Sequence, residues 1–249
     1  MRSLRATVRV VRVLVHLVDG LWTVRWRFAR ADPAQRQALV QDWSRRMLGH
    51  LGVNLVVHGE PPAEGPRLLL ANHISWLDII VISAAAPCRF VSKSEVRRWP
   101  VVGLLVEGTG TLFIEREKRR DARRVVFQIA ERLRAGDMLT VFPEGTTGDG
   151  RSLLPFHPNL LQAAVDTDMP VQLLGLRYRH ALKGEHHDAP TYVGDTSLVA
   201  SVWRTLGSRH VQAELHVGEA DTAQGRDRRT WAQSLRRELA QRLDLPEPD

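Results

Sequence analysis

The sequence predicts an α/β protein: a mixed sheet flanked by helices on both faces, preceded by a pair of N-terminal helices that dock on a membrane. From residue 53 onward, short apolar runs of strand length alternate with amphipathic helical segments. Before residue 53, apolar residues recur at helical spacing instead. We therefore divide the chain into an N-terminal helical pair, residues 1–52, and an α/β domain, residues 53–249.

The first expected helix has one apolar face and one basic face. Its apolar residues recur at steps of three and four: Leu4, Val8, Val11, Val15, Val18 and Trp22. Basic residues follow the same spacing about half a turn away: Arg2, Arg5, Arg9, Arg12 and His16. This pattern is typical of a helix lying on an anionic membrane surface, and no run approaches the ~20 apolar residues of a spanning helix. The alternative is that the apolar stripe packs on the protein's own core.

A second helix is expected to follow, because Asp32 can cap its first turn and Pro33 suits the first helical position. Its apolar stripe comprises Leu39, Val40, Trp43, Met47 and Leu51. Gly49 and Gly52 mark its end.

The remaining elements are assigned from apolar runs and periodicity. Strands are expected at 53–57, 67–72, 90–92, 111–114, 138–142, 171–177, 191–193 and 211–217. Helices are expected at 79–86, within 95–110, and at 121–134, 158–165, 198–206 and 229–243.

The charge distribution narrows the class of partner. The net charge is +7, and residues 1–30 contribute most of it through seven arginines against one acid, Asp19. A nucleic-acid-binding protein would also be basic, but here the charge is confined to one amphipathic segment, which favours a membrane. Cys88 is the only cysteine, which excludes an internal disulfide and a multi-cysteine zinc site. No serine-hydrolase elbow, P-loop or dinucleotide motif is present.

The segment after the expected strand at 67–72 carries the first candidate site. His73 lies on a turn before a helix and Asp78 in its first turn, so the carboxylate can orient the imidazole for general-base chemistry. Ser75 and Asp78 also fit a capping box. Spacing alone leaves these two interpretations equal.

Two further polar segments follow predicted strands. Arg116 begins a basic tract and could hold a phosphate with its forked guanidinium, although a charge run is more often a solvated helix start. Glu144 stands in a glycine-containing loop, residues 142–150, whose backbone can approach a ligand closely. The alternative for this loop is an ordinary turn.

Together, three segments resemble the first three blocks of the glycerolipid acyltransferases in order and spacing: Asn72-His73-x-x-x-x-Asp78, Phe113-Ile114-Glu115-Arg116 and Phe142-Pro143-Glu144-Gly145-Thr146. The resemblance covers about residues 65–180 and is strongest to bacterial 1-acyl-sn-glycerol-3-phosphate (lysophosphatidate) acyltransferases and related lysophospholipid acyltransferases. Thr147 stands where the family often has arginine, and Leu173 where a second proline is expected in the fourth block. Both departures bear on the identity of the acceptor.

The resemblance implies transfer of a fatty acyl group from acyl-CoA or acyl-carrier protein to the free hydroxyl of lysophosphatidate, giving phosphatidate. His73 is the implied general base, oriented by Asp78. The implied substrate-binding residues are Asn72, Arg116 (for the phosphate), Glu144, Gly145 and Thr146. No metal, no cofactor and no nucleic acid is implied.

The expected location is the cytoplasmic face of the inner membrane, where the N-terminal helices contact anionic lipid. One alternative is O-acylation of another lysolipid, such as lyso-ornithine lipid. Another is a catalytically dead membrane-binding scaffold, against which the intact His73 and Asp78 argue.

Overall fold

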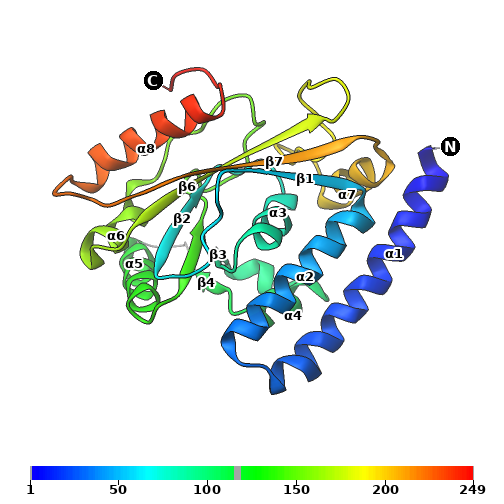
Figure 1. Ribbon diagram of the computed structural model, residues 1–249, viewed down its shortest axis with the longest axis horizontal. Helices are drawn as coiled ribbons and strands as arrows, with labels where there is room; N and C mark the ends of the chain where they lie inside the picture. The colour runs from blue at the N-terminus through cyan, green and yellow to red at the C-terminus, as the bar shows by residue number, and fades with distance from the viewer. Residues whose placement is uncertain (1, 115–118, 249) are drawn as a thin grey trace.

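The computed structural model describes residues 2–114 and 119–248, and its strands form one mixed sheet (Figure 1). The sheet order is β1-β7-β6-β2-β5-β3-β4, and neighbouring strands are parallel except β6 and β7. The strands are β1 (Val53–His58), β2 (Arg67–Ala71), β3 (Arg89–Lys93), β4 (Leu112–Ile114), β5 (Met138–Val141), β6 (Val171–His180) and β7 (Val211–Asp221).

Helices cover both faces of this sheet, so the expected architecture is confirmed. On one face lie α2 (Pro33–Leu51), α3 (Leu77–Ala85) and α7 (Leu198–Gly207), with α1 (Arg2–Trp22) outermost in Figure 1. On the other face lie α5 (Arg119–Arg134), α6 (Gln162–Thr167) and α8 (Arg228–Arg242). The short α4 (Val102–Gly108) precedes β4, and short helical turns span Thr23–Arg27, Phe28–Arg30, Ser94–Arg98 and Pro158–Leu161.

Strand β2 shows why both faces must be covered. Its residues alternate between the two cores: Leu69 and Ala71 face α2 and α3, whereas Leu68 and Leu70 face α5 and α8. All four are fully buried. A central parallel strand with apolar residues on both sides is stable only between two layers of helices.

The expected strand at 191–193 is wrong. These residues form a loop, and the Tyr192 backbone N–H donates to the Ile74 carbonyl at 3.0 Å instead of to a neighbouring strand. Because the apolar run is short, hydrogen bonds with the turn after β2 outweigh its strand propensity.

The two N-terminal helices share a core with the sheet. Ala6 of α1 and Met47, Leu48 and Leu51 of α2 are buried in the same cluster as the residues of β6 and β7. The predicted start and end of α2 are confirmed, because Asp32 forms a capping box with Gln35 and Gly52 adopts a left-handed conformation, φ 72°.

The apolar stripe of α1 faces outward. Leu4 is 71% exposed, Val15 66% and Val18 65%. The alternative that this stripe packs on the protein's own core is therefore wrong. Within residues 2–114 and 119–248, no helix combines the length and the apolar content that crossing a bilayer requires.

Part of the basic face of α1 points inward. Arg5 donates to the Gly207 carbonyl at 3.2 Å, and Arg9 donates to the carbonyls of Leu206 and Ser208 at 2.9 and 2.8 Å. These carbonyls lie at the C-terminal end of α7, where the helix dipole favours cations. His16 is also buried, and its ring stacks on Trp43.

Candidate active site

The turn between β2 and α3 brings His73 and Asp78 together. The Nδ1 atom of His73 lies 2.8 Å from the Oδ2 atom of Asp78, and the side chains are 19% and 0% exposed. The carboxylate accepts at Nδ1, so Nδ1 carries the proton and Nε2 can accept one. The pair therefore has the geometry of a general base with its orienting acid.

Asp78 holds the turn as well as the imidazole. Its Oδ2 atom accepts the backbone N–H groups of Ile74 and Ser75 at 2.7 and 2.9 Å. The bond to Ser75 is one half of the predicted capping box, whereas the Ser75 hydroxyl donates to the Pro190 carbonyl at 2.5 Å. One carboxylate therefore serves both the backbone and the imidazole, but the other half of the capping box does not form, because the Asp78 N–H donates to the Ser75 carbonyl at 3.2 Å instead of to its hydroxyl.

Tyr178 is the fourth group on Asp78. Its hydroxyl donates to the Oδ1 atom at 2.6 Å, and its side chain is fully buried in β6. Burial, followed by the nearby carboxylate, raises the pKa of Tyr178 well above its usual value. Local sequence patterns do not identify Tyr178, although a buried tyrosine requires a partner for its hydroxyl.

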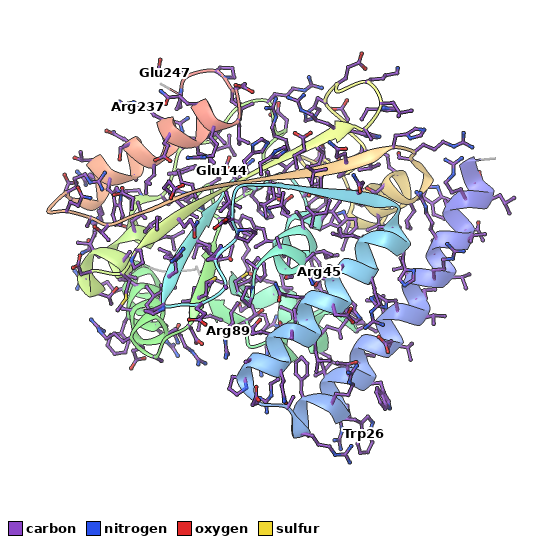
Figure 2. The ribbon with its side chains drawn as sticks, in the orientation of Figure 1. Trp26, Arg45, Arg89, Glu144, Arg237 and Glu247 are labelled. Carbon is purple, nitrogen blue, oxygen red and sulfur yellow. The ribbon has the colours of Figure 1, made fainter. Side chains whose placement is uncertain are left out.

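Glu144 supports the same turn from the loop after β5. Its Oε1 atom accepts the His73 backbone N–H at 2.8 Å, and its Oε2 atom accepts the Leu154 N–H at 2.9 Å. Glu144, labelled in Figure 2, is buried, and burial raises its pKa to about 7 against the two backbone hydrogen bonds that lower it. Both carboxylate oxygens of Glu144 thus accept backbone N–H groups.

The loop after β5 encloses His73. The Phe142 ring stacks on the imidazole with ring centroids 3.9 Å apart, and the Gly148 N–H donates to the His73 carbonyl at 2.7 Å. Gly145 adopts φ 71°, a conformation that favours glycine, and Thr146 is exposed. The Thr147 hydroxyl donates to the Tyr192 carbonyl.

Asn72 joins β2 to β6. Its side-chain amide donates to the Leu176 carbonyl at 3.1 Å, and its oxygen accepts the Leu176 N–H at 2.7 Å. It is 2% exposed. Both polar atoms of the amide are therefore engaged with the backbone of a neighbouring strand.

Arg116 lies outside the described residues, as does the rest of 115–118. It follows β4, which is separated from β2 by β5 and β3 in the sheet. A cavity of about 150 Å³ lies at this end of β4, with Ser94, Arg97 and Arg124 in its wall. The structure thus gathers Asn72, His73, Asp78 and the 144–146 loop, and places the end of β4 further along the same edge.

Two other potential nucleophiles are not activated. Ser75 is fully buried and uses its hydroxyl to bond the Pro190 carbonyl. Burial raises the pKa of the Cys88 thiol to about 12, so this thiol is not ionised near neutral pH.

The fold and the site define an α/β protein with a histidine–aspartate pair at the carboxyl edge of its sheet. A family model described as "Acyltransferase" matches residues 54–175. The chain belongs to the acyltransferase family, and the family resemblance drawn from the sequence is confirmed.

Its relatives include two kinds of lysolipid acyltransferase. It is 37% identical to the lyso-ornithine lipid O-acyltransferase of Pseudomonas aeruginosa, over 92% of this chain and 89% of that protein. It is 36% identical to the 1-acyl-sn-glycerol-3-phosphate acyltransferase of Neisseria meningitidis serogroup B, over 79% and 77%. The crystal structure of the 1-acyl-sn-glycerophosphate acyltransferase from Thermotoga maritima has the same fold, with TM-score 0.65 and 20% identity over 95% and 94% of the chains.

Removing the Tyr178 hydroxyl tests its positioning role. We expect Tyr178→Phe to lower the free energy of unfolding by about 1.5–3 kcal/mol, because a hydrogen bond to a charged group is lost. The remaining negative charge on Asp78 would stabilise the imidazolium of His73 more strongly. The acid limb of the pH–rate profile should therefore move to higher pH, as steady-state kinetics would measure.

Tyr192→Phe is the matched control, because Tyr192 contacts the site through its backbone. It should leave the pH–rate profile in place. An unshifted profile in a folded Tyr178→Phe variant would contradict the positioning role.

The raised pKa of Glu144 makes stability depend on pH. A carboxyl whose pKa is higher in the folded state than the ordinary 4.5 binds a proton on folding, so its stabilising contribution is present below 4.5 and is lost as pH rises through about 7. We expect the free energy of unfolding of the wild type, relative to Glu144→Gln, to fall over this range by on the order of 1–3 kcal/mol.

Urea unfolding at a series of pH values measures this difference. The exposed Glu60→Gln controls for the change in net charge. A difference between wild type and Glu144→Gln that stays constant with pH would exclude the titration of Glu144.

Proposed function

We propose that the protein is a lysolipid O-acyltransferase. It moves a fatty acyl group from a thioester, acyl-CoA or acyl-carrier protein, to the free hydroxyl of a lysolipid. The observation that carries this proposal is the His73–Asp78 pair, with Nδ1 on the carboxylate at 2.8 Å and Nε2 left as the base.

The chemistry needs no covalent enzyme intermediate. His73 takes the proton of the lysolipid hydroxyl, and the hydroxyl oxygen attacks the thioester carbonyl carbon. A C–O ester bond forms and the C–S bond breaks. The imidazolium then returns the proton to the leaving thiolate, while Asp78 supports the transient positive charge.

Asn72 and Glu144 serve this reaction as positioning residues. Glu144 holds the backbone N–H of His73, and Asn72 fixes the end of β2 against Leu176. Gly145 and Thr146 follow in the loop that continues past His73 and are the residues we assign to the acceptor side of the site.

The first candidate acceptor is lysophosphatidate, with Arg116 as the ligand of its phosphate. The support comes from the end of β4, where Arg97 and Arg124 line a cavity just before the 115–118 segment. Arg97 also pairs with Glu107, and a headgroup phosphate would compete with that carboxylate for its guanidinium, whereas Arg124 has no ion pair within the part of the chain that the structure describes.

The second candidate is lyso-ornithine lipid, whose headgroup carries a carboxylate and an amine in place of the phosphate. Thr147 favours it, because the family often has arginine there and the Thr147 hydroxyl bonds the Tyr192 carbonyl instead. The acyltransferase of Pseudomonas aeruginosa, which resembles this chain over most of its length, is named for that acceptor.

The reaction is proposed to take place at a membrane surface. The exposed stripe of α1 supplies apolar area, and α4 and α7, which contact α1, add the exposed Leu104, Val199 and Trp203. Figure 2 labels Trp26 at the far end of the helical pair, where its side chain is about half exposed. Arg12 is exposed beside the stripe and suits anionic lipid.

Purified protein offered lysophosphatidate, lyso-ornithine lipid and other lysolipids with labelled acyl-CoA or acyl-carrier protein tests the activity, with products identified by mass. We expect acylation of at least one of the two named acceptors. His73→Ala should lower the turnover by about 10²–10⁴-fold, because the general base is lost. Asp78→Asn should also lower it, because orientation and charge support are lost.

Circular dichroism of each variant separates loss of chemistry from loss of fold. Near wild-type turnover in a folded His73→Ala variant would falsify the general-base mechanism. Absence of acylation across the panel would exclude the lysolipid assignment.

Replacing Val11, Val15 and Val18 by glutamine tests the membrane surface. These side chains are exposed, so the fold should persist while vesicle binding weakens by roughly two orders of magnitude, at about 1 kcal/mol for each valine. Flotation with vesicles containing anionic lipid measures the binding. Activity should fall more on vesicles than on detergent-dispersed lysolipid.

Leu182→Gln is the control, since Leu182 is 75% exposed in the loop after β6 and lies off the helical pair. Vesicle binding by the Leu182→Gln variant should match that of the wild type. If the α1 variant floats with vesicles as well as the wild type does, the docking surface lies elsewhere.

A further inference from the structure

Two histidines and a glutamate meet on strands β1 and β7. His58 of β1 pairs in register with His216 of β7, and Glu214 lies two residues before His216. Residues two apart on a strand share a face, so these three side chains project from the same side of the sheet. Leu215 faces the opposite side, in the core with α2 and α3.

The ligating atoms of the three residues converge. One nitrogen from each histidine and one oxygen of Glu214 all lie within 4.8 Å of one another. The two imidazole rings stack with centroids 4.4 Å apart. Among the described residues, the buried Nε2 atom of His216 has no hydrogen-bond partner, and it lies 3.7 Å from the Oε2 atom of Glu214.

We propose that His58, Glu214 and His216 bind a zinc ion that joins β1 to β7. Imidazole nitrogen and carboxylate oxygen are common zinc ligands, and three protein ligands leave the fourth position to water. Tetrahedral bonds of 2.0–2.1 Å would place the ligand atoms about 3.3 Å apart. His58 is exposed and can adjust its rotamer, which brings its nitrogen to the other two groups.

Neighbouring cations have other acceptors. Arg179 lies 3.4 Å from the Oε2 atom of Glu214, and its guanidinium also donates to the Gly184 carbonyl at 3.0 Å. Arg177 pairs with Asp244 at 3.2 Å. Gln212 donates to the Oε1 atom of Glu214 at 2.9 Å. Glu214 can therefore turn one oxygen toward the ion without leaving either arginine unpaired.

The site is separate from the His73–Asp78 pair. Tyr178, which bonds Asp78, packs in the core on the opposite face of the sheet, and β1 is separated from β2 by β7 and β6. β1 is an edge strand that follows α2 directly. A bound ion would cross-link this edge strand to β7 and hold the end of β1 that lies furthest from the helical pair.

Calorimetric titration of untagged, EDTA-treated protein with Zn²⁺ tests the site. We expect saturable binding of one zinc ion at this position. The midpoint temperature of thermal unfolding should rise with Zn²⁺ and return to its starting value after EDTA is added. His58→Asn and His216→Asn should each weaken the binding about tenfold or more. His58 is exposed, so His58→Asn should fold and still tests the site if His216→Asn does not fold.

His210→Asn is the matched control. His210 belongs to a second group of rings centred on His180, whose ring centroid lies 5.2 Å from that of His210 and 5.8 Å from that of His187, and the loss of His210 leaves the β1–β7 ligands intact. His210→Asn should not change the affinity of the protein for the zinc ion held by His58 and His216. Absence of saturable binding, or binding undiminished in both β1–β7 variants, would overturn the proposal.

Discussion

The buried carboxylate of Asp78 is the interaction on which the rest of the site depends. It accepts the His73 imidazole, two backbone N–H groups and the Tyr178 hydroxyl, so one side chain ties the end of β2 to the start of α3 and to β6. A buried charge without such partners is costly, so each of these donors offsets part of the cost of burying the carboxylate. The position of His73 is therefore fixed by contacts with α3 and β6 through Asp78, in addition to those with the loop after β5.

Local patterns predicted the elements correctly except for the strand expected at 191–193, and they placed His73 and Asp78 on one turn without deciding between general-base chemistry and a capping box. A strand, a turn and a helix start lie within a few residues of each other, and apolar periodicity places them. Tyr178 could not be found in that way, since it lies 100 residues from Asp78 along the chain. The contacts of Asn72 and Glu144 with the backbone were also beyond a local pattern, because their partners lie on other elements.

The orientation of the N-terminal helix could likewise not be predicted from its local pattern. Its periodicity identifies an apolar face and a basic face, yet it does not say which of them meets the protein. The carbonyl groups at the end of α7 take Arg5 and Arg9, and a narrow set of residues around Ala6 packs on the core. The wide apolar stripe is left outside. Hydrogen bonds and the helix dipole explain why basic residues of this amphipathic helix face the rest of the protein. Hydrophobicity alone does not predict this orientation.

The loops around His73 are coupled through the backbone of Tyr192. The Thr147 hydroxyl donates to the Tyr192 carbonyl and the Ile74 carbonyl accepts the Tyr192 N–H, so the loop after β5, the segment before α7 and the turn that carries His73 are held together. An arginine at position 147 could extend a charge toward an acceptor, whereas threonine uses its one hydroxyl inside this contact. Arg97 and Arg124 instead line the cavity at the end of β4. The loop that contacts His73 therefore carries a neutral side chain at position 147, and the hydrogen bond of that side chain ties the loop to the segment before α7.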